Sequence, residues 1–185
     1  KAETNFQKMK RFEAMNNGVT LVDPSTVFFS FDTELGKDTV VEPNIIFGPG
    51  VRIGNNVRIR SFSYLEGCLV KRNAVVGPFA RIRPETILDE DVKVGNFVEI
   101  KKSKLHKNVK ANHLSYIGDA SIGEQTNVGA GTIFCNYDGT SKNTIKVGEN
   151  SFIGSNTSLV APLEIGDGAV IAAGSTITDD VPKDS

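Results

Sequence analysis

Residues 47–58, FGPGVRIGNNVR, and residues 147–158, VGENSFIGSNTS, are each built of two six-residue units. Every unit opens with a large apolar residue and a glycine, and related units run from about Leu35 to Val181. A unit of six residues is too short to be a repeat of helices, and a glycine at a fixed place marks a corner of the chain. The repeat therefore predicts an all-β fold, a parallel β-helix in which three units, 18 residues, make one triangular coil.

The apolar position that opens each unit can be followed along the chain as a series. Its members are Phe47, Ile53, Ile59, Leu65, Val76, Ile82, Leu88, Val94, Ile100, Leu105, Ala111, Ile117, Ile122, Val128, Val147, Ile153, Leu159, Ile165, Ile171 and Ile177. The steps after Ile100 and after Ile117 are five residues, so each loses one residue at a corner. The step from Val128 to Val147 is nineteen residues and contains FCNYDGTSKN, residues 134–143, which does not fit the repeat. We expect one protruding loop there.

The N-terminal segment has a different pattern. Residues 4–16 carry three apolar residues spaced three apart, namely Phe6, Met9 and Phe12. Gly18 follows them as a stop signal. This spacing predicts a short amphipathic helix that packs on the body of the domain, with a short strand after it at residues 19–23. We therefore divide the chain into a linker helix and lead-in, residues 1–24, and a β-helix domain, residues 25–185.

Composition excludes several classes of protein. The 21 basic and 22 acidic residues give a net charge of -1, with no basic block of the kind that binds nucleic acid. Two cysteines are too few for a disulfide framework or a zinc site, which favours a reducing compartment. No apolar run approaches the roughly 20 residues of a membrane span, and no signal-peptide pattern opens the chain. We expect a cytoplasmic protein without nucleic-acid or membrane partners.

Stacking of the coils brings distant residues together, because equivalent positions on successive coils lie about 4.8 Å apart. Arg83 and Lys101 both follow an apolar position and are one coil apart, so we expect a small cationic ladder at one corner. Glu99 and Tyr116 both precede an apolar position and are also one coil apart. These two side chains should point outward together.

His113 is a candidate general base, because an imidazole with a pKa near 6.5 can accept a proton at neutral pH. Ala130 takes the equivalent place one coil further on, which leaves room beside the imidazole. Glu99 could orient the ring, and three cations could hold a phosphate: Arg83, Lys101 and Lys142. From these residues alone, a surface histidine among solvated charges is an equally good interpretation.

A metal site is not expected. A zinc-dependent hydratase on such a β-helix, as in the gamma class of carbonic anhydrase, needs three histidines, and the chain has only His106 and His113. The NYDG sequence at residues 136–139 also has good turn chemistry, so Asn136 and Tyr137 have a purely structural alternative.

Longer motifs carry a more specific resemblance. They are GPFARIRP at 77–84, VGNFVEIKKS at 94–103, KANHLSYIGDASIG at 110–123, NVGAGTIFCNYDG at 127–139 and IAAGSTIT at 171–178. Together they resemble the C-terminal half of the bacterial bifunctional GlmU family, in which a glucosamine-1-phosphate N-acetyltransferase is joined to an N-acetylglucosamine-1-phosphate uridyltransferase. The resemblance implies a left-handed β-helix and a homotrimer with active sites between subunits. It also implies a role in UDP-N-acetylglucosamine synthesis for the cell envelope, including peptidoglycan and lipopolysaccharide.

The resemblance also implies roles for individual residues. His113 matches the base that takes a proton from the 2-amino group of glucosamine 1-phosphate, supported by Glu99. The positions that match amino-sugar and phosphate contacts are Arg83, Lys101, Tyr116, Asn127 and Lys142. The positions that match the acetyl-CoA site are Ala130, Asn136, Tyr137, Ser155 and Ala173. Ser155 and Ala173 are 18 residues apart and should stack on adjacent coils. These roles lead us to expect direct acetyl transfer in a ternary complex. Backbone N–H groups near Ala130 would donate to the oxyanion of the tetrahedral intermediate.

Two further expectations concern the length of the chain. The family's nucleotide-binding half and a C-terminal tail with a basic residue have no counterpart in these residues. We expect no uridyltransfer, no need for the magnesium that reaction uses, and weaker binding of acetyl-CoA. Two alternatives stay open: another hexapeptide acyltransferase with a different amine or hydroxyl acceptor, and a non-catalytic trimerising β-helix.

Overall fold

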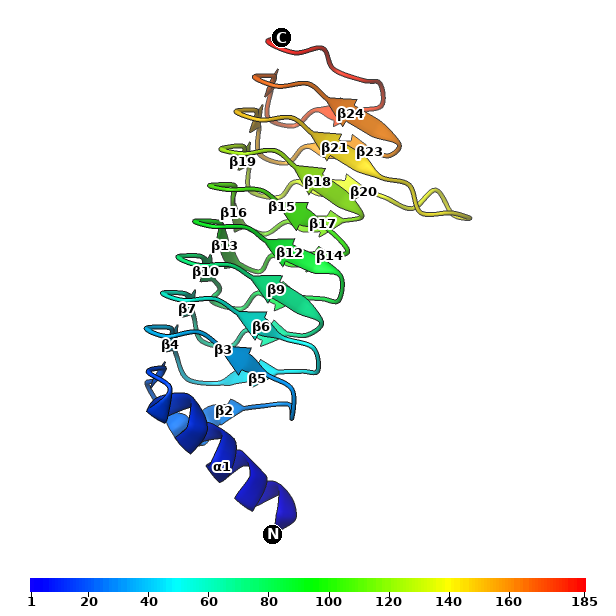
Figure 1. The fold of residues 1–185 in the computed structure, drawn as a ribbon. Helices are drawn as coiled ribbons and strands as arrows, with labels where there is room; N and C mark the ends of the chain where they lie inside the picture. The colour runs from blue at the N-terminus through cyan, green and yellow to red at the C-terminus, as the bar shows by residue number, and fades with distance from the viewer.

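The computed structural model describes residues 1–185 and forms one left-handed parallel β-helix with a single α-helix at its N-terminus (Figure 1). Each strand pairs in parallel with the strand three places further along the chain, so three sheets form the sides of a triangular coil. The period-six repeat thus correctly predicts both the parallel pairing and the triangular cross-section.

The three sheets are named in the order in which the chain first enters them. The first sheet contains β1 (Thr20–Leu21), β4 (Val40–Val41), β7 (Arg58–Ile59), β10 (Val75–Val76), β13 (Lys93–Asn96), β16 (Lys110–His113), β19 (Asn127–Val128), β22 (Phe152–Ile153) and β25 (Val170–Ile171). The second contains β2 (Val27–Phe28), β5 (Ile45–Phe47), β8 (Tyr64–Leu65), β11 (Arg81–Ile82), β14 (Glu99–Lys101), β17 (Tyr116–Gly118), β20 (Ile133–Cys135), β23 (Ser158–Val160) and β26 (Thr176–Ile177). The third contains β3 (Glu34–Leu35), β6 (Arg52–Ile53), β9 (Cys68–Val70), β12 (Thr86–Leu88), β15 (Lys104–Leu105), β18 (Ala120–Ile122), β21 (Ile145–Val147) and β24 (Leu163–Ile165).

The register confirms the apolar series and corrects it at two places, Val70 and Phe134. Ile100 pairs with Ile117 and Leu88 with Leu105, so the five-residue steps fall at corners as predicted. The series omits Val70, which is fully buried and pairs with both Ile53 and Leu88. Its unit is also shortened by one residue and no glycine follows it, so the sequence pattern gave no signal there.

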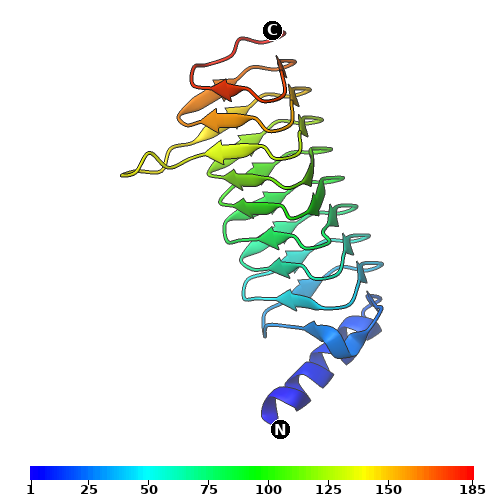
Figure 2. The ribbon, with the colours of Figure 1, turned by 180° about the vertical axis from the view of Figure 1, so that it is seen from behind.

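The predicted loop is present but begins later than expected. Phe134 was placed in the loop, yet it lies in β20, is fully buried and pairs with Leu159 on the next coil. The chain leaves the coil at Asn136 and returns at β21, and Figures 1 and 2 show this segment projecting sideways from the helix. A bridge between Tyr137 and Lys142 closes the projection. The repeat is therefore interrupted after the apolar position, not before it.

Helix α1 (Ala2–Asn16) lies across the N-terminal end of the coil (Figure 1). The predicted apolar contact face is wrong, because Met9 and Phe12 are 59% and 64% exposed. Gln7 is buried instead: its amide group donates to the Phe29 carbonyl at 2.8 Å and accepts from the Phe29 N–H at 2.9 Å. The helix is thus held by backbone groups of the first coil, which need hydrogen-bond partners wherever a parallel sheet ends. A 3₁₀ turn, Pro24–Thr26, follows β1.

The interior is a single apolar column of 40 buried residues that runs the length of the coil. Outward-facing side chains are left free for other contacts, since side chains alternate between the two faces of each strand. Helix α1 lacks the length and apolarity that crossing a bilayer requires.

Candidate active site

His113 ends β16 at the corner between the first and second sheets, and its side chain is exposed. The residue paired with it one coil earlier is Asn96, and the Leu114 N–H donates to the Asn96 carbonyl at 3.0 Å. The side chains meet as well, with 2.8 Å between His113 Nδ1 and Asn96 Oδ1. This contact was not predicted from the sequence, although the 17-residue spacing across a shortened coil would have revealed it.

A column of equivalent corner residues continues from His113 toward the C-terminus. Backbone N–H groups of the following residues join the coils: Gly131 donates to His113 at 3.3 Å, Asn156 to Ala130 at 2.7 Å and Gly174 to Ser155 at 2.8 Å. His113, Ala130, Ser155 and Ala173 therefore occupy the same place on four successive coils. The predicted stacking of Ser155 on Ala173 is confirmed. Beyond the imidazole, this corner carries only small side chains.

A pair of lysines forms a second group, where the projecting loop returns to the coil. Lys101 lowers the pKa of Lys142, mainly because the two amino groups lie close together, while Asp119 and Tyr116 oppose the shift. The one carboxylate near Lys101 is that of Asp119, 4.0 Å from its Nζ. Two ammonium groups that share so little negative charge favour a bound anion such as a phosphate.

The predicted pairs on the second sheet are confirmed by the register. Glu99 pairs with Tyr116, and the Arg83 N–H donates to the Ile100 carbonyl, which places Arg83 one coil before Lys101. The Glu99 carboxylate accepts from the Arg83 guanidinium at 2.8 Å. Glu99 is thus bonded to Arg83, whereas the side chain bonded to His113 is that of Asn96.

Two residues of the loop have different environments. Asn136 is 5% exposed, and its amide donates to the Asp119 carboxylate, which itself is buried. Tyr137 is exposed, with its hydroxyl donating to the Gly139 carbonyl at 2.6 Å. Asp119 was not singled out from the sequence, yet it joins the base of the loop to Lys101.

Asn127 lies apart from the lysine pair. It belongs to β19 on the first sheet, between Lys110 and Phe152 in the register, whereas Lys101 is on the second sheet. Within one chain, therefore, the structure gathers the predicted residues into a corner column that contains His113 and a lysine group, and it leaves Asn127 on a neighbouring face.

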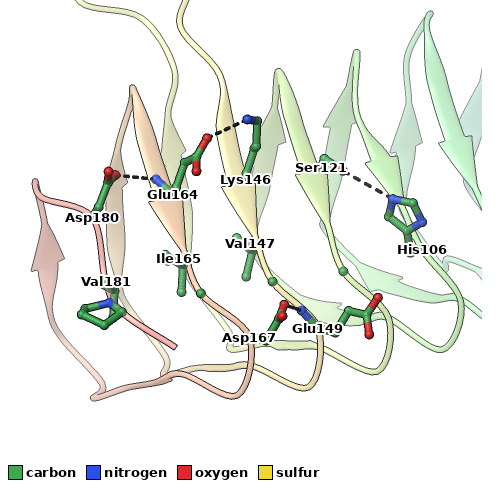
Figure 3. Close-up of a pocket in the computed structure, with 14 residues that line it drawn as sticks. His106, Ser121, Lys146, Val147, Glu149, Glu164, Ile165, Asp167, Asp180 and Val181 are labelled. Atoms are coloured by element: carbon green, nitrogen blue, oxygen red, sulfur yellow. Dashed lines mark hydrogen bonds and ion pairs between the residues drawn. The ribbon is translucent and has the colours of Figure 1, made fainter. Parts of the chain in front are cut away.

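A groove of about 550 Å³ on the third sheet contains none of the predicted site residues (Figure 3). At one end, the Ser121 hydroxyl lies 3.4 Å from His106 Nε2, and His106 Nδ1 lies 3.5 Å from an Asp89 carboxylate oxygen. Lys71 Nζ is only 2.6 Å from the other oxygen of Asp89, so the charge of this carboxylate is already balanced. At the other end, Lys146 is paired with Glu164 at 2.6 Å.

Comparison with known proteins first defines the class. The protein-family model described as "Bacterial transferase hexapeptide (six repeats)" matches residues 32–67 and 144–179 of the sequence. The solved structure of a Francisella novicida UDP-N-acetylglucosamine acyltransferase shares the fold, with a TM-score of 0.63 at 16% identity, covering 83% of this chain and 61% of that one. The chain is therefore a hexapeptide-repeat β-helix protein.

Sequence relatives then narrow the family. The chain is 55% identical over 99% of its length to the bifunctional protein GlmU of Zymomonas mobilis, and 54% identical over 97% to that of Sphingopyxis alaskensis. It spans only 41% and 40% of these two relatives. The resemblance to the GlmU family is thus confirmed, and this chain corresponds along its whole length to one region of those proteins.

Proposed function

We propose that this chain is an acetyltransferase region that moves the acetyl group of acetyl-CoA to the 2-amino group of glucosamine 1-phosphate. The product, N-acetylglucosamine 1-phosphate, would serve UDP-N-acetylglucosamine and cell-envelope synthesis. The observation that carries the proposal is the corner column, in which an exposed imidazole precedes a strip of small side chains. The similarity to GlmU proteins, which extends along 99% of this chain, supports the choice of acceptor.

In the proposed reaction, the neutral amine attacks the thioester carbonyl carbon and a C–N bond forms. His113 Nε2 takes the proton that the amine nitrogen loses, the C–S bond breaks, and the imidazolium returns the proton to the departing thiolate. The amine is itself the nucleophile, so positioning and proton transfer are sufficient and no covalent enzyme intermediate forms.

The acceptor would be held mainly through its phosphate. Lys101 and Lys142 supply the unbalanced positive charge, and Arg83 adds a guanidinium that the Glu99 carboxylate holds in place. Glu99 would then support the site by anchoring Arg83. Tyr116, beside Glu99 on the next coil, and Asn127 would contact the sugar.

Acetyl-CoA would lie along the corner column. Ala130, Ser155 and Ala173 offer little steric hindrance there, and Asn136 and Tyr137 at the base of the loop would complete the site. The Ala130 N–H has no acceptor within the chain, which leaves it free to donate to the oxyanion of the tetrahedral intermediate.

We also propose that the chain acts as a homotrimer in the cytoplasm, with sites between subunits. The separation of Asn127 from Lys101 on different sheets supports a site shared by two chains. An exposed stripe of stacked aromatic rings, Phe62, Phe79 and Phe97, with centroids 5.0 and 5.1 Å apart, supports self-association. Light scattering coupled to size exclusion tests the assembly, and a monomer at micromolar concentration would contradict it.

The activity is tested by thiol release from acetyl-CoA with glucosamine 1-phosphate. We expect His113→Ala to lower kcat by about a hundredfold or more, as for the loss of a general base. His106→Ala is the matched control, since the other histidine directly follows β15 of the third sheet, and it should retain activity. Activity on another amine or hydroxyl but not on glucosamine 1-phosphate would select a different hexapeptide acyltransferase. Intact trimers without any transfer would select a non-catalytic role.

A further inference from the structure

The hydrogen bond between His113 and Asn96 suggests what orients the proposed base. The two residues are direct register partners on β16 and β13, so backbone pairing fixes the distance between their Cα atoms. Both are followed by a corner residue with positive φ, 56° at Phe97 and 51° at Leu114. Because two consecutive coils turn in the same way, the two side chains leave the corner side by side.

We infer that Asn96 is the positioning residue that sets the tautomer and ring orientation of His113. This inference rests on the proposed function. The side-chain oxygen of Asn96 lies 2.8 Å from His113 Nδ1, and an amide oxygen can only accept a hydrogen bond. The proton of the neutral imidazole is therefore on Nδ1, and the lone pair is on Nε2. Asn96 thus selects the nitrogen that can accept the proton of the acceptor amine.

No charged group competes with Asn96 for this task. The ionisable side chains on the strands next to His113 are Lys93 and Lys110 on the first sheet, and Glu99, Lys101 and Tyr116 on the second. None forms an ion pair with His113, and the Glu99 carboxylate is bonded to Arg83. A neutral amide orients the ring through this hydrogen bond without placing a charge beside it.

Three variants separate this role from simple packing. Asn96→Leu keeps the approximate shape and removes the acceptor. Asn96→Asp keeps acceptor oxygens and adds a charge. Asn112→Ala is the control, because this asparagine precedes His113 on the same strand and its side chain makes no hydrogen bond within the chain.

The first measurement is the ¹⁵N NMR spectrum of the His113 imidazole in the whole chain. We expect an Nδ1–H tautomer in the wild type, in Asn96→Asp and in Asn112→Ala, and a mixture of tautomers in Asn96→Leu. A wild-type ring protonated at Nε2, or a tautomer unchanged by Asn96→Leu, would overturn the inference. This measurement does not depend on which acceptor the enzyme uses, so it separates failure of the inference from failure of the proposed function.

The second measurement is the pH dependence of acetyl transfer. Asn96→Leu should lower kcat by about tenfold to a hundredfold with little change in KM, as for other residues that orient a functional histidine. Asn96→Asp should restore most of the rate, with the acidic limb of the profile moved upward by about one pH unit or more, because a carboxylate stabilises the imidazolium. Equal losses in all three variants, without a shift of the profile, would indicate a structural role and refute the inference.

Discussion

Replacing Phe134 by alanine tests where the coil ends and the projecting loop begins. The Phe134 side chain is fully buried in β20, between the apolar positions of Ile117 and Leu159. Burying such a ring contributes about 1.5–3 kcal/mol by transfer from water. The cavity left by Phe134→Ala adds to this, for a total loss of about 3–5 kcal/mol in the free energy of unfolding.

The matched control is Ile133→Ala, because Ile133 is the neighbour of Phe134 on the same strand and is 40% exposed. It should lose less than about 1.5 kcal/mol, since much of its apolar surface is already in water. Urea unfolding followed by circular dichroism compares the two variants at one protein concentration, because self-association would make stability depend on concentration. Equal, small losses would refute the buried position of Phe134 and return it to the loop.

Two further predictions concern ionisable groups, and a third concerns metal ions. Lys101 lowers the pKa of Lys142, so the KM for the sugar phosphate should begin to rise at a lower pH than the titration of an ordinary lysine would cause. NMR should detect a higher Lys142 pKa in the Lys101→Met variant. An unchanged Lys142 pKa would contradict the proximity of the two amino groups. Burial raises the pKa of the Cys68 thiol to about 12, so a disulfide reagent at pH 8 should modify Cys68 only after unfolding, and rapid reaction in the folded protein would argue against its burial. Acetyl transfer should be unaffected by EDTA, and inhibition that magnesium reverses would show a metal requirement that the proposed mechanism lacks.

Much of the fold follows from the spacing of apolar residues alone. A six-residue period fixes which side chains enter the interior, and therefore which residues share a row on successive coils. For this reason the pairs Glu99–Tyr116 and Ser155–Ala173 were predicted correctly. The period weakens where a unit is shortened, and the buried position of Val70 was missed.

The partners of individual side chains could not be predicted in the same way. A row contains several residues about 4.8 Å apart, and their rotamers decide which two of them bond. The sequence offered Glu99 as the partner of His113, but the corner geometry places Asn96 there and leaves Glu99 to Arg83. Helix α1 shows the same limit, since its apolar residues predicted one contact face and Gln7 makes the contact instead.

The sequence by itself determined a parallel coil with one interruption, and it named His113, Arg83, Lys101 and Lys142 as chemically capable residues. Tertiary structure alone decided that the interruption begins after Phe134, that Lys101 and Lys142 meet, and that an asparagine holds the imidazole. The physical reason is that periodic burial is a property of each residue's place in its own unit. Hydrogen bonds and charge interactions depend instead on directions and distances between coils, which exist only once the coils are stacked.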